Sequence, residues 1–578
     1  MSFSIRRIYD DNLPVNRRAI DQIIEITRRQ IADMTEESLE FLRNLLRNPY
    51  HRRMRYFFFV VDDGREVKGF AMMSYAQDLK FCYLDLLAMK NQRKGSGIGG
   101  AVYERVREEA LNLKAAGIFI ECLTDSGRFI RDPILLRQNR ARLKFYEQFG
   151  ARPLLGTQYE AHSRNRYSYP YFLLYDDLDQ KRELGQAQAR RIIRAILLRK
   201  YDPPASPREI NGVLRSLKDD PVRLREPRYI RKEMAHPIRP IPDDRKILLI
   251  CNEESDIAHV KERGYVEAPV RIRTVLRELE RTPYFLRIKS RRFAERFVRD
   301  IHDPDYVRYL KQICRNMEPG RSLYAEVFPI WKSDRPPRRL AARAGYYGTD
   351  VFSPLHRNTY DAARGAVNCA LTGAVGILEG ARTAYALVRP PGHHADKNSF
   401  GGFSYFNSAA VAAHYLSRYG RVALLDIDYH HGSGHQEIFY ARQSVFTLSI
   451  HADPDYEYPY FSGFRGERGK GAGEGYNVNY PLPDGVTGGQ YLTVLKRALR
   501  EIRSFGPDFL VLSLGFDTAK GDPTGTWKLQ KTDFRNNGRL IGALGVPVLV
   551  VQEGGYNSRL LGVNARYFFT GLWEGVYQ

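Results

Sequence analysis

Two adjacent histidines, His393 and His394, follow a Pro-Pro-Gly turn in the stretch RPPGHHADKN. A second polar stretch, LLDIDYHHGSG, ends an apolar run with Asp426, Asp428 and His430. Seven of the thirteen histidines lie between positions 393 and 451, so imidazoles are concentrated in this part of the chain. Imidazole and carboxylate groups at this density indicate metal binding or general acid–base chemistry.

The carboxylates and one histidine of LLDIDYHHGSG suit a metal ion. Strand alternation sends Asp426, Asp428 and His430 to the same side of their strand. Asp517, at the end of DFLVLSLGFD, is the predicted third ligand beside Asp428 and His430. This Asp₂His set leaves an open coordination position, as catalytic zinc sites do, and its oxygen donors also suit Fe²⁺. Capping of the next turn would explain one aspartate, but burying this much charge without a cation costs heavily.

A catalytic metal site also needs a base, an acid and a donor for a developing oxyanion. His393 and His394 are the predicted base and acid, with one of them oriented by Asp426. Tyr556, in QEGGYN, is the predicted oxyanion donor, and its alternative role is a core tyrosine that anchors a glycine turn. The aromatic stretches GGFSYF and DPDYEYPYF could line a narrow channel, although ordinary core packing explains them equally well.

The elements that must position these residues are short apolar runs, each followed by one of the polar motifs. They are TAYALV before RPPGHH, RVALLDI before DYHHG, VFTLSI before HADPD, DFLVLSL before GFDT and VPVLVV before QEGGY. Continuous Val/Leu/Ile runs predict a parallel sheet that is buried on both faces. Ligands of such sheets bind beyond the carboxyl ends of the strands, where every one of these motifs lies.

Length and composition limit the remaining possibilities. A chain of 578 residues is too long for one core and should divide into domains. The five scattered cysteines form no C-x-x-C pair, the N-terminus lacks a signal-peptide pattern, and no apolar run could span a membrane. A cytoplasmic protein is therefore expected. The net charge of +23 has no accompanying nucleic-acid-binding motif, and residues 179–245 are predicted to be a basic, partly helical, proline-containing linker.

The N-terminal half contains a glycine-rich turn in KNQRKGSGIGGAVYERV. A predicted hairpin, YFFFVVDDGREVKGFAMMSY, and a strand, FCYLDLLAM, precede this turn, and a helix from Ala101 follows it. Gly95, Gly97 and Gly100 satisfy G-x-G-x-x-G, and Glu121 lies near the position that a dinucleotide-binding fold requires. The hairpin argues against a dinucleotide-binding fold, which is built from βαβ units. A glycine-rich turn that opens a helix can also bind the pyrophosphate of coenzyme A.

The combination RPPGHH, GGFSYFN, DIDYHHGSG, LGFDT and EGGY resembles the zinc-dependent histone deacetylase superfamily, most of all its acetylpolyamine amidohydrolase branch. The resemblance covers residues 246–578 and implies an arginase/deacetylase α/β fold that hydrolyses an N-acetyl amide. By position, it implies Zn²⁺ at Asp428, His430 and Asp517. It also implies catalytic roles for His393, His394 and Tyr556, with Asp426 orienting His393, and a structural K⁺ near Asp426, Asp428 and Ser449.

Two departures from the family pattern concern specificity. Ser433 stands where histone deacetylases often carry an aspartate, so a carboxylate partner for His394 is missing. Polyamine enzymes place a carboxylate before the GYY-like segment, whereas this chain offers Ala341 and Arg343. An arginine there disfavours a cationic polyamine and favours a neutral or anionic acetylated amine, or an acetyl-lysine side chain.

The N-terminal order of hairpin, strand, QRKGSGIGG, helix, strand FIECL and then NRARLKFYEQFG resembles the GNAT superfamily of N-acetyltransferases over residues 1–178. The resemblance implies acetyl-CoA binding by the glycine turn and Asn139, with Tyr146 as the acid for the leaving thiolate. The turn's signature fits in two registers, and together they involve Gln92, Lys94, Gly95, Gly97, Gly99 and Gly100. Glu121 and Asp85 are both open as the base.

The predicted architecture is thus an N-terminal GNAT α/β domain (1–178), the linker, and a C-terminal arginase/deacetylase domain with a central parallel sheet (246–578). The predicted activity is bifunctional: zinc-dependent hydrolysis of a small acetylated amine and acetyl transfer from acetyl-CoA. The alternatives are a protein acetyl-lysine deacetylase with a regulatory acetyl-CoA-binding domain, and a non-catalytic acetyl-amine sensor. Neither a membrane nor a specific nucleic acid is expected as a partner. A homodimer that forms through about residues 324–354 is expected.

Overall fold

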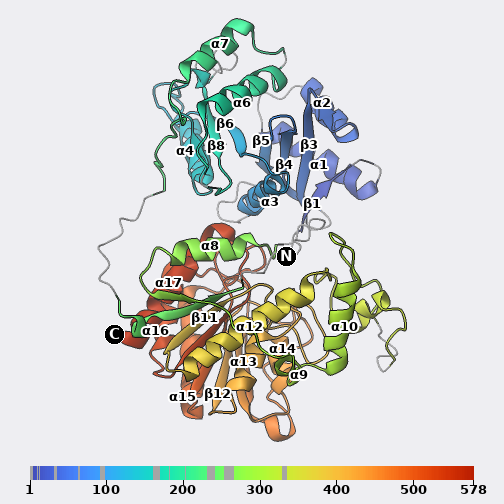
Figure 1. Ribbon diagram of the computed structural model, residues 1–578, viewed down its shortest axis with the longest axis vertical. Helices are drawn as coiled ribbons and strands as arrows, with labels where there is room; N and C mark the ends of the chain where they lie inside the picture. Colours follow the sequence, from blue (N-terminus) through green and yellow to red (C-terminus); the bar gives the residue numbers. More distant parts are fainter. Residues whose placement is uncertain are drawn as a thin grey trace. The chain divides into compact units, whose positions relative to one another are not determined.

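The computed structural model describes residues 4–9, 11, 13–30, 36–62, 66–90, 98–160, 169–180, 182–201, 203–230, 241–252, 266–328 and 335–578. These residues divide into two units, one made of residues up to 230 and the other of residues from 241 onward. Each unit is built on its own sheet (Figure 1). No helix in the described ranges combines the length and the apolar character needed to cross a membrane.

The first unit has a mostly antiparallel sheet in the order β1-β3-β4-β5-β6-β8-β7, with β2 paired to β3. The predicted hairpin is present as β3 and β4, whose register pairs Val60 with Phe70. The strand bounds are β1 Ser4–Ile8, β2 Tyr50–His51, β3 Met54–Asp62, β4 Val67–Ala76, β5 Phe81–Met89, β6 Ile118–Leu123, β7 Arg152–Pro153 and β8 Tyr171–Asp176.

One pair of strands in this sheet is parallel, and it is short. β5 pairs with β6 only over Cys82–Leu84 and Ile118–Ile120. On its other side, β5 pairs with β4 through a bulge: Met72 faces Leu86 and Met73 faces Leu84, so Asp85 is the extra residue. Leu84 and Ile120 are thus the last residues through which β5 and β6 pair with each other. Asp85 and Glu121 are the first residues beyond that point.

Helices cover both faces of the first sheet. Their bounds are α1 Pro14–Gln30, α2 Glu36–Arg47, α3 Ile98–Asn112, α4 Pro133–Glu147, α6 Gln186–Arg199 and α7 Pro207–Ser216. α3 and α4 contribute to one buried cluster, and α1, α2, α6 and α7 contribute to the other. α7 begins with a capping box between Ser206 and Glu209 and has Pro207 in its first turn, which explains why a helix forms directly after a proline-rich stretch.

The structure differs from the predicted linker over most of its length. Leu184, Ile192, Ile196 and Leu217 are buried in the same cluster as Phe58 of β3. The arginines of α6 lie between these apolar positions, so a basic composition conceals an amphipathic helix that packs on the sheet. Residues 184–222 therefore belong to the first unit.

The second unit has an eight-stranded sheet in the order β10-β9-β11-β16-β15-β12-β13-β14, and every pair in it is parallel. The parallel sheet predicted for the C-terminal half is therefore confirmed. The strand bounds are β9 Ile247–Cys251, β10 Phe285–Ile288, β11 Thr383–Leu387, β12 Val422–Asp426, β13 Val445–Ala452, β14 Asn477–Leu482, β15 Phe509–Leu514 and β16 Val548–Gln552.

Both faces of this sheet are covered by helices, as the strand sequences require. Along β12, Val422 and Leu424 join one buried cluster, and Ala423 and Leu425 join the other. α12 and α13 pack on the first of these faces, and α8, α15, α16 and α17 lie on the second (Figure 1). The helix bounds are α8 Val270–Leu279, α9 Arg296–Arg299, α10 Pro304–Asn316, α11 Ala344–Tyr347, α12 Thr359–Leu378, α13 Ser408–Leu416, α14 Ser433–Phe439, α15 Gly488–Phe505, α16 Lys531–Gly542 and α17 Ser558–Tyr577.

Candidate metal centre and catalytic pocket

The three predicted metal ligands meet at the carboxyl ends of neighbouring strands. β12 ends at Asp426, and Asp428 and His430 follow it in the next turn; Asp517 follows β15. One ligand atom from each of Asp428, His430 and Asp517 lies within 4.8 Å of the others. His430 Nδ1 is 3.4 Å from Asp428 Oδ1 and 3.3 Å from Asp517 Oδ2. Because the strand has already ended, hydrogen bonds from main-chain amides to side-chain carboxylates orient this turn. The Asp428 amide donates to Asp426 Oδ1, and the His430 amide donates to Asp428 Oδ1.

The surroundings of this cluster fit a cation. Within the described part of the chain, Asp517 Oδ2 is buried and accepts no hydrogen bond of good geometry. Burial and the like charge of Asp428 raise the pKa of Asp517 to about 7. A Cβ on Gly554 would lie 2.2 Å from Asp517 Oδ2 and 2.6 Å from Asp428 Oδ2, so only glycine leaves these oxygens accessible. Two buried carboxylates and an imidazole form a donor set that suits Zn²⁺ or Fe²⁺.

The histidine pair lies directly beside the cluster. His393 Nδ1 is 3.0 Å from Asp426 Oδ2, and His393 Nε2 is 3.9 Å from Asp428 Oδ1. His394 Nδ1 is 3.3 Å from Ser433 Oγ, and the two imidazole centroids are 3.9 Å apart. Glu553 also holds the RPPGHH turn in place, because its Oε2 accepts hydrogen bonds from the amides of Gly392 and His393.

The two histidines differ in their electrostatic environments. Burial lowers the pKa of His393, but the carboxylates of Asp428 and Asp426 outweigh it and raise that pKa to about 10. Burial and the neighbouring charge of His393 hold the pKa of His394 well below its usual value. A cation on Asp428 would offset that carboxylate and lower the pKa of His393. Without a cation, His393 therefore favours the protonated form and His394 the neutral form.

Tyr556 lies in the turn after β16, where Gly555 adopts a φ of 109°. Its ring packs edge-on against Phe403, with centroids 5.8 Å apart. Burial and the charges of Asp517 and Asp428 raise the pKa of Tyr556 well above its usual value, so its hydroxyl stays protonated. The buried Tyr556 hydroxyl is therefore a proton donor that responds to the charges of the two carboxylate ligands.

Arg271 of α8 supports this tyrosine, and the sequence analysis missed it. Its guanidinium lies 4.6 Å from the centre of the Tyr556 ring and donates to the carbonyl oxygens of Gly555 and Glu553. Glu267 pairs with both Arg271 and Arg389, so the buried guanidinium is balanced. No local motif marks Arg271, because the two carbonyl groups that it binds beside Tyr556 lie more than 280 residues away in the sequence.

A second residue that the sequence did not predict is Asp350, which contacts a neighbour of the histidine pair. Asp350 Oδ2 accepts hydrogen bonds from the Tyr458 hydroxyl at 2.8 Å and from the Gly402 amide at 2.5 Å. Tyr458 in turn packs edge-on against His394, with centroids 4.8 Å apart. Of the predicted channel tyrosines, Tyr458 lies against the histidines, whereas Tyr456 and Tyr460 are 75% and 51% exposed.

Arg343 was expected to meet the distal end of a substrate. Its Nε donates to the Pro337 carbonyl at 2.6 Å, and its guanidinium lies near Tyr309 and Tyr347. None of these contacts, all among described residues, is with the histidine pair or the metal ligands.

The candidate residues of the first unit are only partly within the described ranges. Gln92, Lys94, Gly95 and Gly97 lie outside them, whereas Gly99 and Gly100 form the first turn of α3. Tyr146 and Asn139 are buried on α4. Asn139 Nδ2 donates to the Thr124 carbonyl at 3.1 Å, and its Oδ1 accepts no hydrogen bond from a described residue. Burial raises the pKa of Tyr146 above its usual range.

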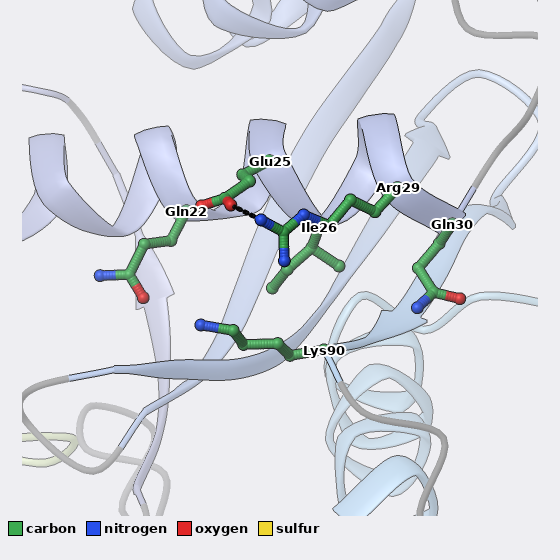
Figure 2. A pocket seen from close by; sticks show the side chains of 6 residues that line it. All are labelled: Gln22, Glu25, Ile26, Arg29, Gln30 and Lys90. Carbon is green, nitrogen blue, oxygen red and sulfur yellow. Dashed lines mark ion pairs between the residues drawn. The ribbon is translucent and has the colours of Figure 1, made fainter.

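A small polar recess also occurs on the first unit, between α1 and the end of β5. Gln22, Glu25, Ile26, Arg29, Gln30 and Lys90 line it (Figure 2). Its charges are already paired, since Arg29 contacts Glu25 and Lys90 contacts Glu66. We assign no chemistry to this recess.

Comparison with known proteins agrees with the geometry of the second unit. Acetylpolyamine amidohydrolase 2 of Pseudomonas aeruginosa is 42% identical over 49% of this chain and 83% of its own length. Acetylpolyamine amidohydrolase 1 of the same species is 39% identical over 56% of this chain and 95% of its own length. The crystal structure of acetylpolyamine aminohydrolase from Burkholderia pseudomallei, at 38% identity and a TM-score of 0.54, covers 56% of this chain and 98% of that one.

The match to a family is equally direct. Residues 265–572 match the histone deacetylase domain, and this range includes the histidine pair, all three metal-ligand candidates and Tyr556. The chain therefore belongs to the histone deacetylase family, and its second unit carries a hydrolytic deacetylase domain of that family.

Proposed function

We propose that the second unit hydrolyses the N-acetyl amide of a small amine, with Zn²⁺ held by Asp428, His430 and Asp517. The observation that carries this proposal is the position of the histidine pair, since His393 Nε2 lies 3.9 Å from Asp428 Oδ1. Zn²⁺ in such a site supplies Lewis acidity at neutral pH. Fe²⁺ suits the same donors, and metal analysis of the purified protein distinguishes the two.

The chain's own residues would move the protons. His393 is oriented through Nδ1 by Asp426, and His394 through Nδ1 by Ser433, so each imidazole keeps Nε2 for the reaction. One histidine takes the proton of the attacking water, and the other gives a proton to the leaving amine. The Tyr556 hydroxyl donates to the acetyl oxygen as negative charge develops on it.

A small acetylated amine is the favoured substrate class for two reasons. The relatives that this unit resembles are named acetylpolyamine amidohydrolases. In addition, Asp350 places a carboxylate beside Tyr458, which packs against His394, and a carboxylate at this position favours a substrate with a distal ammonium group. The alternatives are a protein acetyl-lysine deacetylase with a regulatory acetyl-CoA-binding domain, and a sensor without turnover.

The test is acetate release by the Zn²⁺-loaded protein from acetylated diamines, acetylated amino acids and an acetyl-lysine peptide. Tyr556→Phe is expected to lower the rate about 10²- to 10³-fold, the usual cost of one oxyanion donor, without lowering zinc content. A preference for the peptide would favour the protein deacetylase. Zinc binding without release from any substrate would favour the sensor.

We further propose that the first unit transfers an acetyl group from acetyl-CoA to an amine. The order of its elements supports this: the hairpin β3–β4, then β5, α3, β6 and α4, as the GNAT resemblance implies. β5 runs on to Met89 after its last pairing with β6 at Leu84, which leaves main-chain groups available to a ligand. Thiol release from acetyl-CoA in the presence of amines, lost in Tyr146→Phe, would support transfer.

We also propose a structural K⁺ ion and a homodimer. A structural K⁺ near Asp426, Asp428 and Ser449 is supported by the register of β12 and β13, which pairs Asp426 with Ser449. Dependence of the unfolding temperature on K⁺, with Na⁺ as the control, tests it. The homodimer through residues 324–354 is tested by sedimentation of the full chain.

A further inference from the structure

Two carboxylates mark the point where β5 and β6 stop pairing in the first unit, and both are covered by consecutive residues of one helix end. Asp85 and Glu121 directly follow the last paired residues, Leu84 and Ile120. Lys200, the C-cap of α6, donates from Nζ to Asp85 Oδ1. Tyr201 donates its hydroxyl to Glu121 Oε1. The two residues that follow α6 thus contact both strands at the point where the pairing between them stops.

The surroundings of Lys200 Nζ form a cage for an ammonium group. Besides Asp85, Nζ donates to the Tyr56 hydroxyl at 3.1 Å and to Ser74 Oγ at 3.2 Å. It also lies 4.7 Å and 5.0 Å from the ring centres of Tyr56 and Tyr83. Two aromatic rings, two hydroxyls and one carboxylate are the groups by which proteins recognise alkylammonium ligands.

The second carboxylate is held in a similar way. Tyr159 and Tyr201 both donate to Glu121 Oε1, and their hydroxyl oxygens lie 2.9 Å apart. Arg52 donates to the Tyr201 carbonyl at 2.5 Å and so fixes the backbone that carries both Lys200 and Tyr201. The side chains of Lys200 and Tyr201 are therefore held in place together.

A purely structural role explains this arrangement poorly. The Lys200 and Asp85 side chains are only 8% and 9% exposed, and lysine is rarely buried to that extent. A buried ion pair adds little stability over an apolar pair of similar volume. Burial lowers the pKa of Lys200, but the Asp85 carboxylate outweighs it and raises that pKa, so the amine stays an ammonium.

We propose that Tyr56, Ser74, Tyr83 and Asp85 form a binding site for a primary alkylammonium group, and that Lys200 of the same chain occupies this site. The ligand class is a primary aliphatic amine, and an external amine enters only when the end of α6 withdraws. The proposal deepens the proposed acetyl transfer, because it assigns that amine as the acceptor.

The transfer step balances with acetyl-CoA as the co-reactant. The amine nitrogen forms a bond to the acetyl carbon as the C–S bond breaks. Before the attack, the ammonium passes one proton to Asp85 and then to solvent, so that the free amine reacts. After the attack, the nitrogen loses a second proton, which restores the proton that Tyr146 has given to the leaving thiolate. The products are an N-acetyl amine and free coenzyme A.

The experiment uses Lys200→Ala in the full chain, with n-propylamine to replace the side-chain atoms from Cγ to Nζ. Propylammonium is expected to bind in calorimetry and to raise the unfolding temperature of this variant, while wild type shows no change. The neutral isostere n-propanol should do neither, and Lys200→Ala/Asp85→Asn should lose both effects. Equal stabilisation by propanol, or no binding, would overturn the proposal.

A Lys200→Ala chain that folds only with propylammonium supports the site, whereas one that fails to fold with and without it counts against the site. Lys200→Met, which keeps the stem without the charge, is the matched control and should fold without binding the amine. Adding acetyl-CoA then tests the acceptor role: bound amine without N-acetylpropylamine leaves the ammonium site standing and refutes the transferase.

Discussion

At the scale of single residues, the metal cluster depends on a glycine that carries no functional group. The amide of Gly554 donates to Asp428 Oδ2 at 2.7 Å, and its missing Cβ leaves room beside the oxygens of Asp428 and Asp517. Interiors are packed closely enough that one added methyl group displaces its neighbours. The spacing of the ligands is thus set by main chain as well as by side chains.

Gly554→Ala is expected to disturb the cluster, because the new Cβ would lie 2.2 Å from Asp517 Oδ2. The expected result is a loss of at least about tenfold in Zn²⁺ affinity, in line with disruption of groups that orient metal ligands. Metal content after dialysis and acetate release measure the effect.

The matched control is Gly489→Ala in the first turn of α15, where no atom lies within 4 Å of the new Cβ. This control should bind metal like the wild type. Wild-type zinc affinity in Gly554→Ala would show that the oxygens of Asp428 and Asp517 do not depend on this glycine.

The sequence predicted the residues of the site that occur in short motifs, and it missed those that act through distant partners. Asp428 and His430 share one motif, and Asp517 ends an apolar run, so a strand-end rule was enough to group them. Asp350 and Tyr458 are separated by 108 residues. Tyr458 belongs to an aromatic stretch that the sequence offered as a channel lining, but no local pattern marks Asp350, and only the packing of the loops brings the two together.

At the scale of elements, the apolar runs predicted the parallel strands of the second unit well. β11, β12, β13, β15 and β16 all coincide with such runs, because a strand buried on both faces has little room for polar residues. The prediction that α6 belongs to a solvated linker was wrong, because the sequence of α6 mixes apolar residues with charged ones. Its isoleucines have helical spacing, but their arginine neighbours and the prolines that follow suggested a solvated segment.

Ile196→Ala in α6 is expected to destabilise the first unit by about 2–5 kcal/mol, because Ile196 is fully buried in the cluster with Phe58. A solvated linker would tolerate the change. The measurement is urea unfolding followed by a probe in the first unit. Leu198→Ala, at a 43% exposed position of the same helix, is the control and should cost less than about 0.5 kcal/mol. Equal effects of the two changes would place α6 outside the folded core.

At the scale of the whole molecule, each unit has buried clusters of its own on the two faces of its sheet. A unit with its own core is expected to unfold as a separate cooperative transition. The metal-ligand candidates all lie in the second unit, and the ammonium cage lies entirely in the first. Ligands of the two sites should therefore act on different transitions.

Removal of the metal is expected to lower the unfolding temperature of the second unit only. A ligand that binds the folded state alone stabilises it by about 4 kcal/mol at a concentration 1,000 times its Kd. Without the cation, the buried carboxylates of Asp428 and Asp517 repel each other, and burial together with this repulsion raises the pKa of Asp517 to about 7. Scanning calorimetry of the full chain with and without a chelator measures the shift. Ile196→Ala assigns the transition of the first unit, because it should lower that transition and leave the chelator-sensitive one unchanged. A chelator that lowers both transitions equally would show that the two units unfold as one.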